Sequence, residues 1–125
     1  CLVIGNSASG SGGGVYSTGY LVDCDIVNNT AAAGPGGGIA ANLSYGCLTV
    51  RCCNVVGNHA ATLAGGVRAS FVFDSQIISN SAGLGGGGGY GGGSPDFGYM
   101  TNCVIKFNSS ADYGGGVNQY NLSPQ

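Results

Sequence analysis

The stretch from Cys53 to Val67, which reads CNVVGNHAATLAGGV, contains the pattern that decides the fold of this chain. A cysteine is followed after two positions by an aliphatic residue and after five by an asparagine, and a glycine pair with another aliphatic residue closes the pattern. The 125-residue sequence carries five copies, which begin at Cys1, Cys24, Cys53, Ser75 and Cys103. Self-similarity at a period of roughly 20–50 residues indicates a repeat architecture.

The spacing within each copy favours short strands. The cysteine and the aliphatic residue two positions later point to one side of an extended chain, and no copy has apolar residues at helical spacing. We expect about two or three strands per copy, and stacking the copies about 4.8 Å apart would pair each strand with the next copy and bury a continuous core. The sequence therefore predicts an all-β fold without helices: one domain, residues 1–125, forming a right-handed parallel β-helix (a solenoid) of about five coils.

Two repeated positions are expected to form columns along this stack. The asparagines are Asn6, Asn29, Asn58, Asn80 and Asn108. Asparagine tolerates the left-handed backbone of a corner, and stacked asparagines can form a hydrogen-bonded ladder. The cysteines of the second column are Cys1, Cys24, Cys53 and Cys103, with Ser75 between the last two. A spacing of about 4.8 Å is compatible with disulfides, and a column of buried thiols is the alternative.

The connections between copies vary in length. We expect loop insertions at residues 40–46 and 85–95, because solenoids accept insertions at one corner. Cys47 and Cys52 lie outside the cysteine column and are candidates for a local disulfide. Asn42, Asn28 and Asn121 each begin an Asn-x-Ser/Thr tripeptide and are candidates for glycosylation. Six cysteines and several such tripeptides suit an extracellular protein at the cell surface.

The glycine and asparagine motifs resemble those of a known group of β-helix repeats. Gly36–Ile39 (Gly-Gly-Gly-Ile) and Ile26–Asn29 (Ile-x-x-Asn) are similar to the paired motifs of polymorphic outer-membrane proteins and autotransporter passenger domains. In this chain aliphatic residues replace the family's phenylalanine, and glycine usually replaces its alanine. The resemblance covers residues 1 to about 117 and implies a surface-exposed structural or adhesive protein.

Composition excludes several classes of function. Three basic and five acidic residues give a net charge of −2, which is no footprint for nucleic acid. No stretch approaches the roughly 18 apolar residues of a membrane span. The glycine clusters lack the Lys-Ser/Thr ending of a phosphate loop, and the single histidine, His59, is expected at an exposed corner. We therefore expect no cofactor and no metal site.

An enzyme is the alternative that needs most weight, because parallel β-helices also include polysaccharide lyases and glycosidases. Asp23 and Asp74 precede the cysteine position two copies apart, about 9.6 Å, close to the separation of some glycosidase carboxylates. Aspartate is common at turns, however, and Arg51, Arg68 and Lys106 fall at different positions of the repeat. We expect both aspartates to be corner residues and the protein to have no catalytic residues.

The phase of the repeat suggests an assembly. Nine residues separate Val15 from Cys24, and nine residues beyond Val117 lead to position 126, where Cys1 of another copy would continue the pattern. We therefore expect head-to-tail stacking of copies into a surface fibre or part of an adhesin stalk. The alternatives are an excised fragment of a longer autotransporter passenger, or a domain that binds or degrades polysaccharides. In the carbohydrate-binding alternative, the partners are surface glycans and exposed tyrosines bind them. The candidate tyrosines are Tyr16, Tyr20, Tyr45, Tyr90, Tyr99 and Tyr113.

Overall fold

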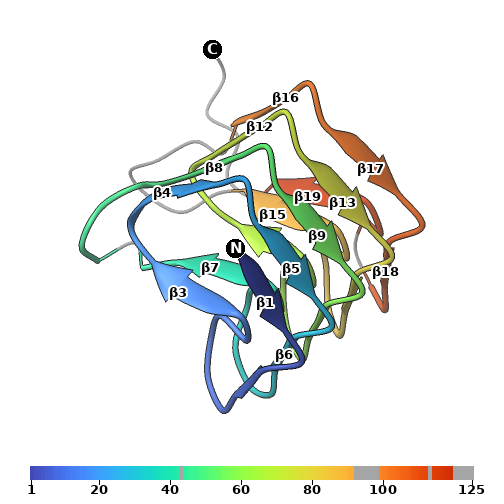
Figure 1. Ribbon diagram of the computed structural model, residues 1–125. Helices are drawn as coiled ribbons and strands as arrows, with labels where there is room; N and C mark the ends of the chain where they lie inside the picture. Colours follow the sequence, from blue (N-terminus) through green and yellow to red (C-terminus); the bar gives the residue numbers. More distant parts are fainter. Residues whose placement is uncertain (43, 92–98, 113, 120–125) are drawn as a thin grey trace.

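The computed structural model describes residues 1–42, 44–91, 99–112 and 114–119. Within these ranges the chain is all-β, contains no helix, and pairs its strands in parallel. The described strands form four sheets, named A to D in the order in which the chain enters them. The chain runs through sheets A, B, C and D, a course called one passage, and then returns to sheet A beside the strand it left (Figure 1).

Each sheet collects the equivalent strand of successive passages. Sheet A contains β1 (Leu2–Ile4), β5 (Asp25–Val27), β9 (Asn54–Val56), β13 (Gln76–Ile78) and β17 (Val104–Lys106). Sheet B contains β2 (Ser7–Ala8), β6 (Thr30–Ala31), β10 (His59–Ala60), β14 (Ser81–Ala82) and β18 (Ser109–Ser110). Sheet C contains β3 (Val15–Ser17), β7 (Ile39–Ala41), β11 (Val67–Arg68), β15 (Gly89–Gly91) and β19 (Val117–Gln119). Sheet D contains β4 (Gly19–Val22), β8 (Leu48–Arg51), β12 (Phe71–Phe73) and β16 (Tyr99–Thr101).

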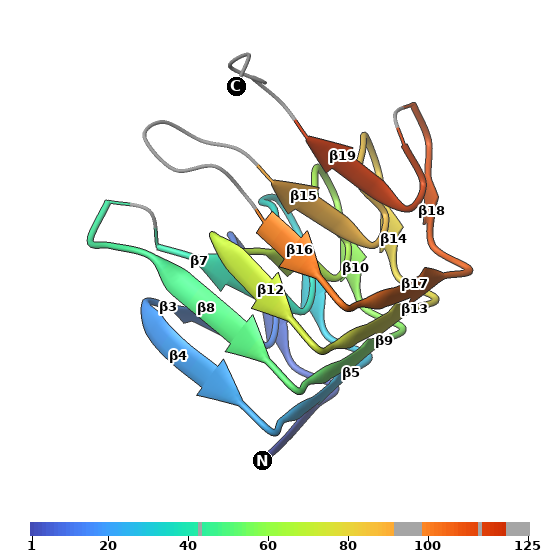
Figure 2. The same ribbon diagram turned by 90° about the horizontal axis from the view of Figure 1, so that it is seen from above.

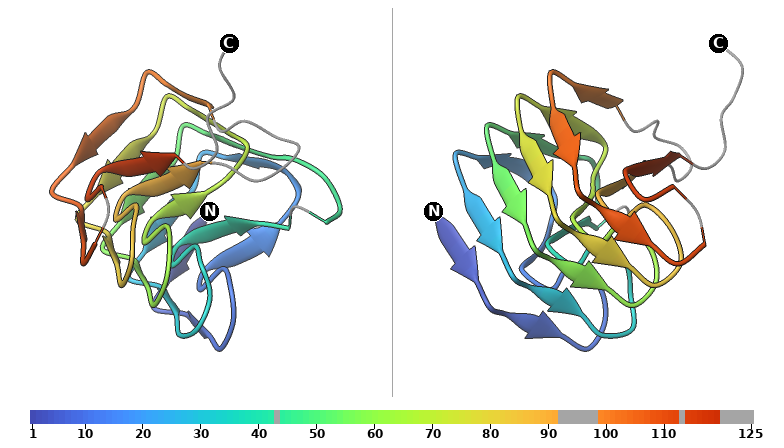
Figure 3. Two further views of the ribbon diagram at one scale, coloured as in Figure 1. Left: turned by 180° about the vertical axis from the view of Figure 1, so that it is seen from behind. Right: turned by 90° about the vertical axis from the view of Figure 1, so that its right-hand side faces the viewer.

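The register of the sheets aligns the repeated positions of the sequence. In sheet A, Ile26 pairs with Val55, which pairs with Ile77, and all three side chains are fully buried. The core cluster joins such residues of sheet A to aliphatic residues of sheets C and D, for example Ile39 and Val50. Figure 2 shows sheets D and A running next to each other along the stack, and Figure 3 shows the strands following one another in the colour order of the chain. The core therefore follows from the period-two spacing of the repeat.

The corners of each passage differ in one detail from the sequence-based expectation. The left-handed backbone precedes each ladder asparagine, at Gly5, Asn28, Gly57, Ser79 and Phe107. A second left-handed series precedes the cysteine column, at Asp23, Cys52, Asp74 and Asn102. The expectation that the ladder asparagines themselves are left-handed was wrong. The turn is made one residue earlier, and the asparagine side chain then points inward. The side chains of Asn29, Asn58 and Asn80 are buried.

The number of strands and the two predicted insertions also differ from expectation. Each complete passage in the described ranges has four strands, whereas two or three were expected. The strands of sheet B were missed because two residues are too few to show alternation in the sequence. The predicted insertions 40–46 and 85–95 overlap β7 and β15, so part of each belongs to sheet C. Position 89 of β15 is a glycine, and the terminal methyl group of Met100 lies where a β-carbon at this position would be.

Candidate functional site

The five asparagines of the repeat form a continuous ladder in the structure, at the turn between sheets A and B. Each ladder asparagine after Asn6 accepts two hydrogen bonds at its Oδ1 atom, from the backbone N–H and the Nδ2 group of the preceding ladder asparagine. For Asn58 Oδ1 the donors are Asn29 N at 2.9 Å and Asn29 Nδ2 at 3.0 Å. Equivalent pairs join Asn6 to Asn29, Asn58 to Asn80, and Asn80 to Asn108.

The second N–H of each amide is used as well. Asn58 Nδ2 donates to the carbonyl of Ile26 at 2.9 Å, and Asn80 Nδ2 donates to the carbonyl of Val55 at 2.9 Å. Asn58 is 1% exposed and makes all four of these side-chain hydrogen bonds inside the protein. The desolvation of a buried amide is thereby offset by full hydrogen bonding.

The ladder has a direction, and its two ends are complementary. In every hydrogen bond between two ladder asparagines, the residue of the earlier passage donates and the Oδ1 atom of the later passage accepts. Among the described residues, no donor reaches Oδ1 of Asn6, and the backbone N–H of Asn108 reaches no acceptor. One end of the ladder therefore presents an acceptor and the other end presents donors.

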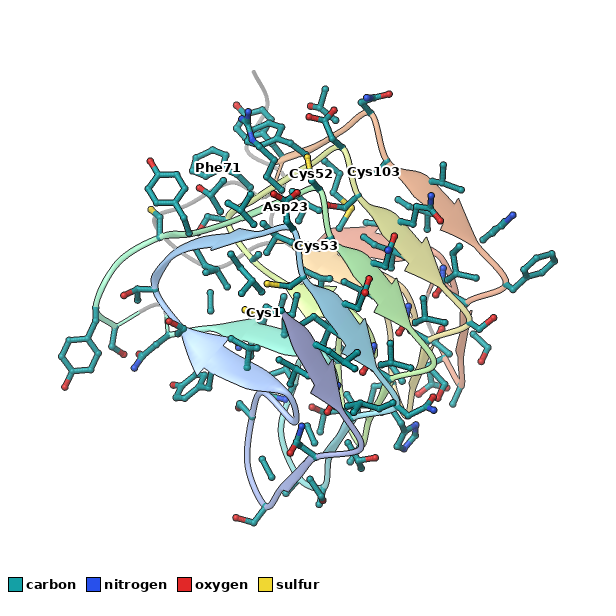
Figure 4. All side chains as sticks on the ribbon, viewed as in Figure 1. Cys1, Asp23, Cys52, Cys53, Phe71 and Cys103 are labelled. Atoms are coloured by element: carbon teal, nitrogen blue, oxygen red, sulfur yellow. The ribbon has the colours of Figure 1, made fainter. Side chains whose placement is uncertain are left out.

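The cysteine column runs between sheets D and A (Figure 4). The backbone carbonyls of Cys1, Cys24, Cys53 and Ser75 accept hydrogen bonds from the next passage, which aligns these positions one above another. The thiols of Cys24 and Cys53 donate to the carbonyl two residues earlier, both at 3.2 Å. Ser75 donates to Phe73 in the same way at 2.8 Å, so serine and cysteine play the same part at this position.

The structure contains no disulfide within the cysteine column, which corrects the disulfide alternative. Cys1, Cys24, Cys53 and Cys103 are thiols. Neighbouring side chains of a parallel ladder project side by side at about 4.8 Å, whereas bridged β-carbons lie about 3.8 Å apart. The column is thus a row of packed thiols, buried at Cys24 and Cys53.

The predicted local disulfide between Cys47 and Cys52 is not formed either, because Cys52 is a thiol. The two cysteines lie at opposite ends of strand β8. Five residue steps of about 3.3 Å place them roughly 16 Å apart, beyond the reach of a disulfide. Proximity in sequence was misleading here because the intervening residues are extended.

The thiols of neighbouring residues 52 and 53 are expected to differ in reactivity. Burial raises the pKa of the Cys53 thiol above its ordinary value, whereas Cys52 is exposed. Since the thiolate is the reactive form, iodoacetamide at pH 8 should modify Cys52 within minutes and spare Cys53 until the protein unfolds. Peptide mass mapping measures both, and unfolded protein is the control. Equal rates at Cys52 and Cys53 in the folded protein would contradict the buried column.

The same pKa shift predicts a small effect of pH on stability. Burial favours the neutral thiol, so the contribution of Cys53 to folding is fully present below pH 9.0 and is lost as the pH rises through the higher pKa of the folded state. Replacing Cys53 by serine, the residue at position 75 of the same column, should remove this part of the alkaline decline.

Of the charged residues considered for catalysis, Arg51 adjoins the corner that carries Asp23 and Asp74, whereas Arg68 and Lys106 lie in other sheets. Asp23 and Asp74 occupy the same corner position in different passages, with Cys52 between them. Asp74 Oδ1 accepts a hydrogen bond from Asn102 Nδ2 at 2.7 Å. Arg51, Arg68 and Lys106 belong to sheets D, C and A respectively. Exposed His59 lies in strand β10 rather than at a corner, and its Nδ1 is 2.8 Å from Ser81 Oγ. The described residues include no group of three His, Cys, Asp or Glu side chains able to hold a metal ion.

The candidate glycosylation sites have different environments. Asn28 is exposed at a left-handed corner, beside the buried Asn29. Asn42 follows strand β7 and is partly buried, and its backbone N–H donates to Ser17 at 2.9 Å. Asn121 lies outside the described residues. Asn28 is therefore the most accessible of the described candidates.

The sequence analysis did not identify the outward side of sheet D, named here the aromatic face. Register pairs Tyr20 with Thr49, Thr49 with Phe71, and Phe71 with Tyr99. The neighbouring row contains Val22, Arg51, Phe73 and Thr101. The alternation in Phe71-Val72-Phe73 was a visible signal, but the aromatic positions are not part of the repeated motif.

Comparisons with known proteins add no identification: no protein-family model, no curated protein and no solved structure matches the chain. The described part of the chain has no helix long and apolar enough to cross a membrane.

Proposed function

We propose that this protein is an extracellular structural subunit, a right-handed parallel β-helix whose copies stack head to tail into a surface fibre or part of an adhesin stalk. The proposal assigns it no catalytic role and no cofactor. The four-sheet passage supports a helical course, and connections between parallel strands of one sheet are right-handed in about 98% of cases. The resemblance to outer-membrane and autotransporter repeats supports the cell-surface location.

The complementary ends of the asparagine ladder carry the assembly proposal. A second copy placed on the Asn108 end would bring its Asn6 Oδ1 to the position where the next acceptor of the ladder belongs. The same translation would pair β17 with β1 of that copy in parallel, as β13 already pairs with β17. An interface between two different ends of identical subunits does not close on itself, so it produces filaments.

The edges involved are apolar as well as unpaired. Within the described strands, β1 has a partner only on the β5 side and β17 only on the β13 side. Leu2 is 64% exposed, Ile4 54% and Val104 48%. An exposed strand edge with apolar side chains is a template for another strand. Stacking would satisfy its backbone groups and cover part of this surface.

Ile4 offers a way to block the edge without disturbing the subunit. Cys1 O accepts from Asp25 N, and Gly5 N donates to Val27 O. Because the backbone groups of alternate residues point to opposite neighbours, those of Ile4 point away from β5. Proline at position 4 would remove an outward N–H and leave the β1–β5 hydrogen bonds in place.

Sedimentation velocity over a concentration series tests the proposal. We expect the wild-type chain to form species several times heavier than 12.2 kDa, and Ile4→Pro to remain monomeric with the same circular dichroism spectrum. Ile4→Ala is the matched control, because it shortens the side chain and keeps the N–H, and it should still assemble. A wild-type monomer at every concentration, or assembly of Ile4→Pro as strong as that of the wild type, would refute the stacking.

A further inference from the structure

The aromatic face of sheet D is a side surface of the stack, so head-to-tail assembly would leave it uncovered. Its outward residues combine large exposed rings with polar groups. Tyr20 is 82% exposed and Tyr99 is 53% exposed, while Phe71 and Phe73 are partly buried. Figure 4 shows Phe71 on the outside of the sheet, away from the column of Cys53 and Cys103.

The rings of Phe71, Phe73 and Tyr99 share one orientation. The centroids of Phe71 and Tyr99 are 5.8 Å apart with planes inclined by 5°. Those of Phe71 and Phe73 are 6.3 Å apart with planes inclined by 7°. Mutual contact holds Phe71 in place between these two neighbours. A fixed set of parallel rings can pack against a flat apolar surface of a ligand at little cost in side-chain entropy.

Strand β8 interrupts the rings with polar side chains. Thr49 lies between Tyr20 and Phe71 in the register of the sheet, and Arg51 lies between Val22 and Phe73. Two strand spacings, about 9.6 Å, therefore separate the backbones that carry Tyr20 and Phe71. A flat ring that contacts one aromatic ring on each of its faces at about 3.5–4.0 Å needs roughly 7–8 Å between those two aromatic rings. The separation of Tyr20 and Phe71 along the sheet therefore suits a single sugar ring.

Arg51 gives this position a charge preference. Its guanidinium carbon lies 5.1 Å from the centroid of the Phe73 ring, which orients the exposed group over the face. No outward residue of the aromatic face is acidic. Asp23 and Asp74 lie at the adjoining corner, one passage before and one passage after Cys52, and Asp74 accepts a hydrogen bond from Asn102. Among the described residues Arg51 makes no ion pair, and its guanidinium is held over the Phe73 ring. Such a group is suited to bind a carboxylate through two parallel hydrogen bonds.

We propose that the aromatic face binds an acidic polysaccharide, with a sugar ring between Tyr20 and Phe71 and its carboxylate on Arg51. The aromatic rings contact the C–H faces of the sugar, and Thr49 and Arg51 bind its polar groups. A neutral polysaccharide would leave Arg51 unused. A peptide that adds as a strand needs a sheet edge, and this surface is the face of a sheet.

Native gel electrophoresis in gels containing alginate or hyaluronate, both carboxylated, tests this proposal against gels containing neutral dextran. We expect both acidic polymers to retard the wild-type chain and dextran to have no effect. Arg51→Gln should weaken the retardation at least about tenfold, the loss of one charge-assisted hydrogen-bonded contact. Tyr20→Ala should weaken it several-fold. Retardation should also decrease as salt is added.

Matched variants separate this site from general attraction to an anionic polymer. Lys106→Gln removes an exposed cation from sheet A, and Tyr45→Ala removes a ring that is 83% exposed but lies outside sheet D. Both should bind as the wild type does. Equal losses in Lys106→Gln and Arg51→Gln, retardation by dextran equal to that by alginate, or no retardation by either acidic polymer would each overturn the proposal. Circular dichroism confirms that each variant is folded.

Discussion

Replacing Asn58 by leucine is expected to reduce the free energy of unfolding by at least about 4 kcal/mol. The substitution removes four buried side-chain hydrogen bonds, to Ile26 O, Asn80 Oδ1, Asn29 N and Asn29 Nδ2. Each buried group left without a partner costs about 1–3 kcal/mol. Since small domains are stable by about 5–15 kcal/mol, this variant should unfold at far lower denaturant concentration or fail to fold.

The control for this variant is the same substitution at the end of the ladder. Asn6 is exposed, and leucine there removes only the Nδ2 hydrogen bonds to Asn29 Oδ1 and Ile4 O. We expect a loss below about 1 kcal/mol, because water can satisfy the groups that are released. Urea unfolding followed by circular dichroism measures both variants. Equal losses for Asn6→Leu and Asn58→Leu would show that the ladder does not stabilise the core.

Replacing Gly65 by alanine is expected to reduce the free energy of unfolding by about 3 kcal/mol, although it adds one methyl group. A β-carbon at this position would overlap the carbonyl oxygen of Ser81 and lie 2.5 Å from that of Gly87. Both obstacles are backbone atoms of the next passage, so neither can move without opening the stack. The glycine is required by the close approach of successive passages.

Gly10→Ala is the matched control, because a β-carbon at Gly10 would meet no heavy atom within 4 Å. We expect its midpoint of urea unfolding to equal that of the wild type or to rise slightly, since alanine restricts the unfolded chain more than glycine does. A Gly65→Ala variant as stable as Gly10→Ala would mean that the passages are farther apart than the structure has them.

The repeated motif contained enough information to predict the all-β class and its parallel strands. The spacing of residues such as Cys53, Val55 and Asn58 reports directly which side chains share a face. It did not reveal the number of strands per passage, because a two-residue strand such as His59–Ala60 has no periodicity to detect.

Other features depend on contacts that a single copy of the motif cannot show. The left-handed backbone falls on Asn28 and not on Asn29, and residue type could not decide between them because both are asparagine. The aromatic face arises because Phe71 and Tyr99, 28 positions apart, come into register through sheet D. The cysteines of the column are thiols packed side by side on parallel strands, and Cys47 and Cys52 are separated by the extended strand β8; cysteine spacing alone discloses neither arrangement.

The measurement that tests the central proposal most directly is the axial rise per subunit in assemblies of the purified chain, determined by electron microscopy. Five passages stacked at about 4.8 Å predict filaments with a rise of about 24 Å per subunit and strands perpendicular to the filament axis. Dispersed monomers at high concentration, or filaments with a rise unrelated to this value, would contradict head-to-tail continuation of the stack.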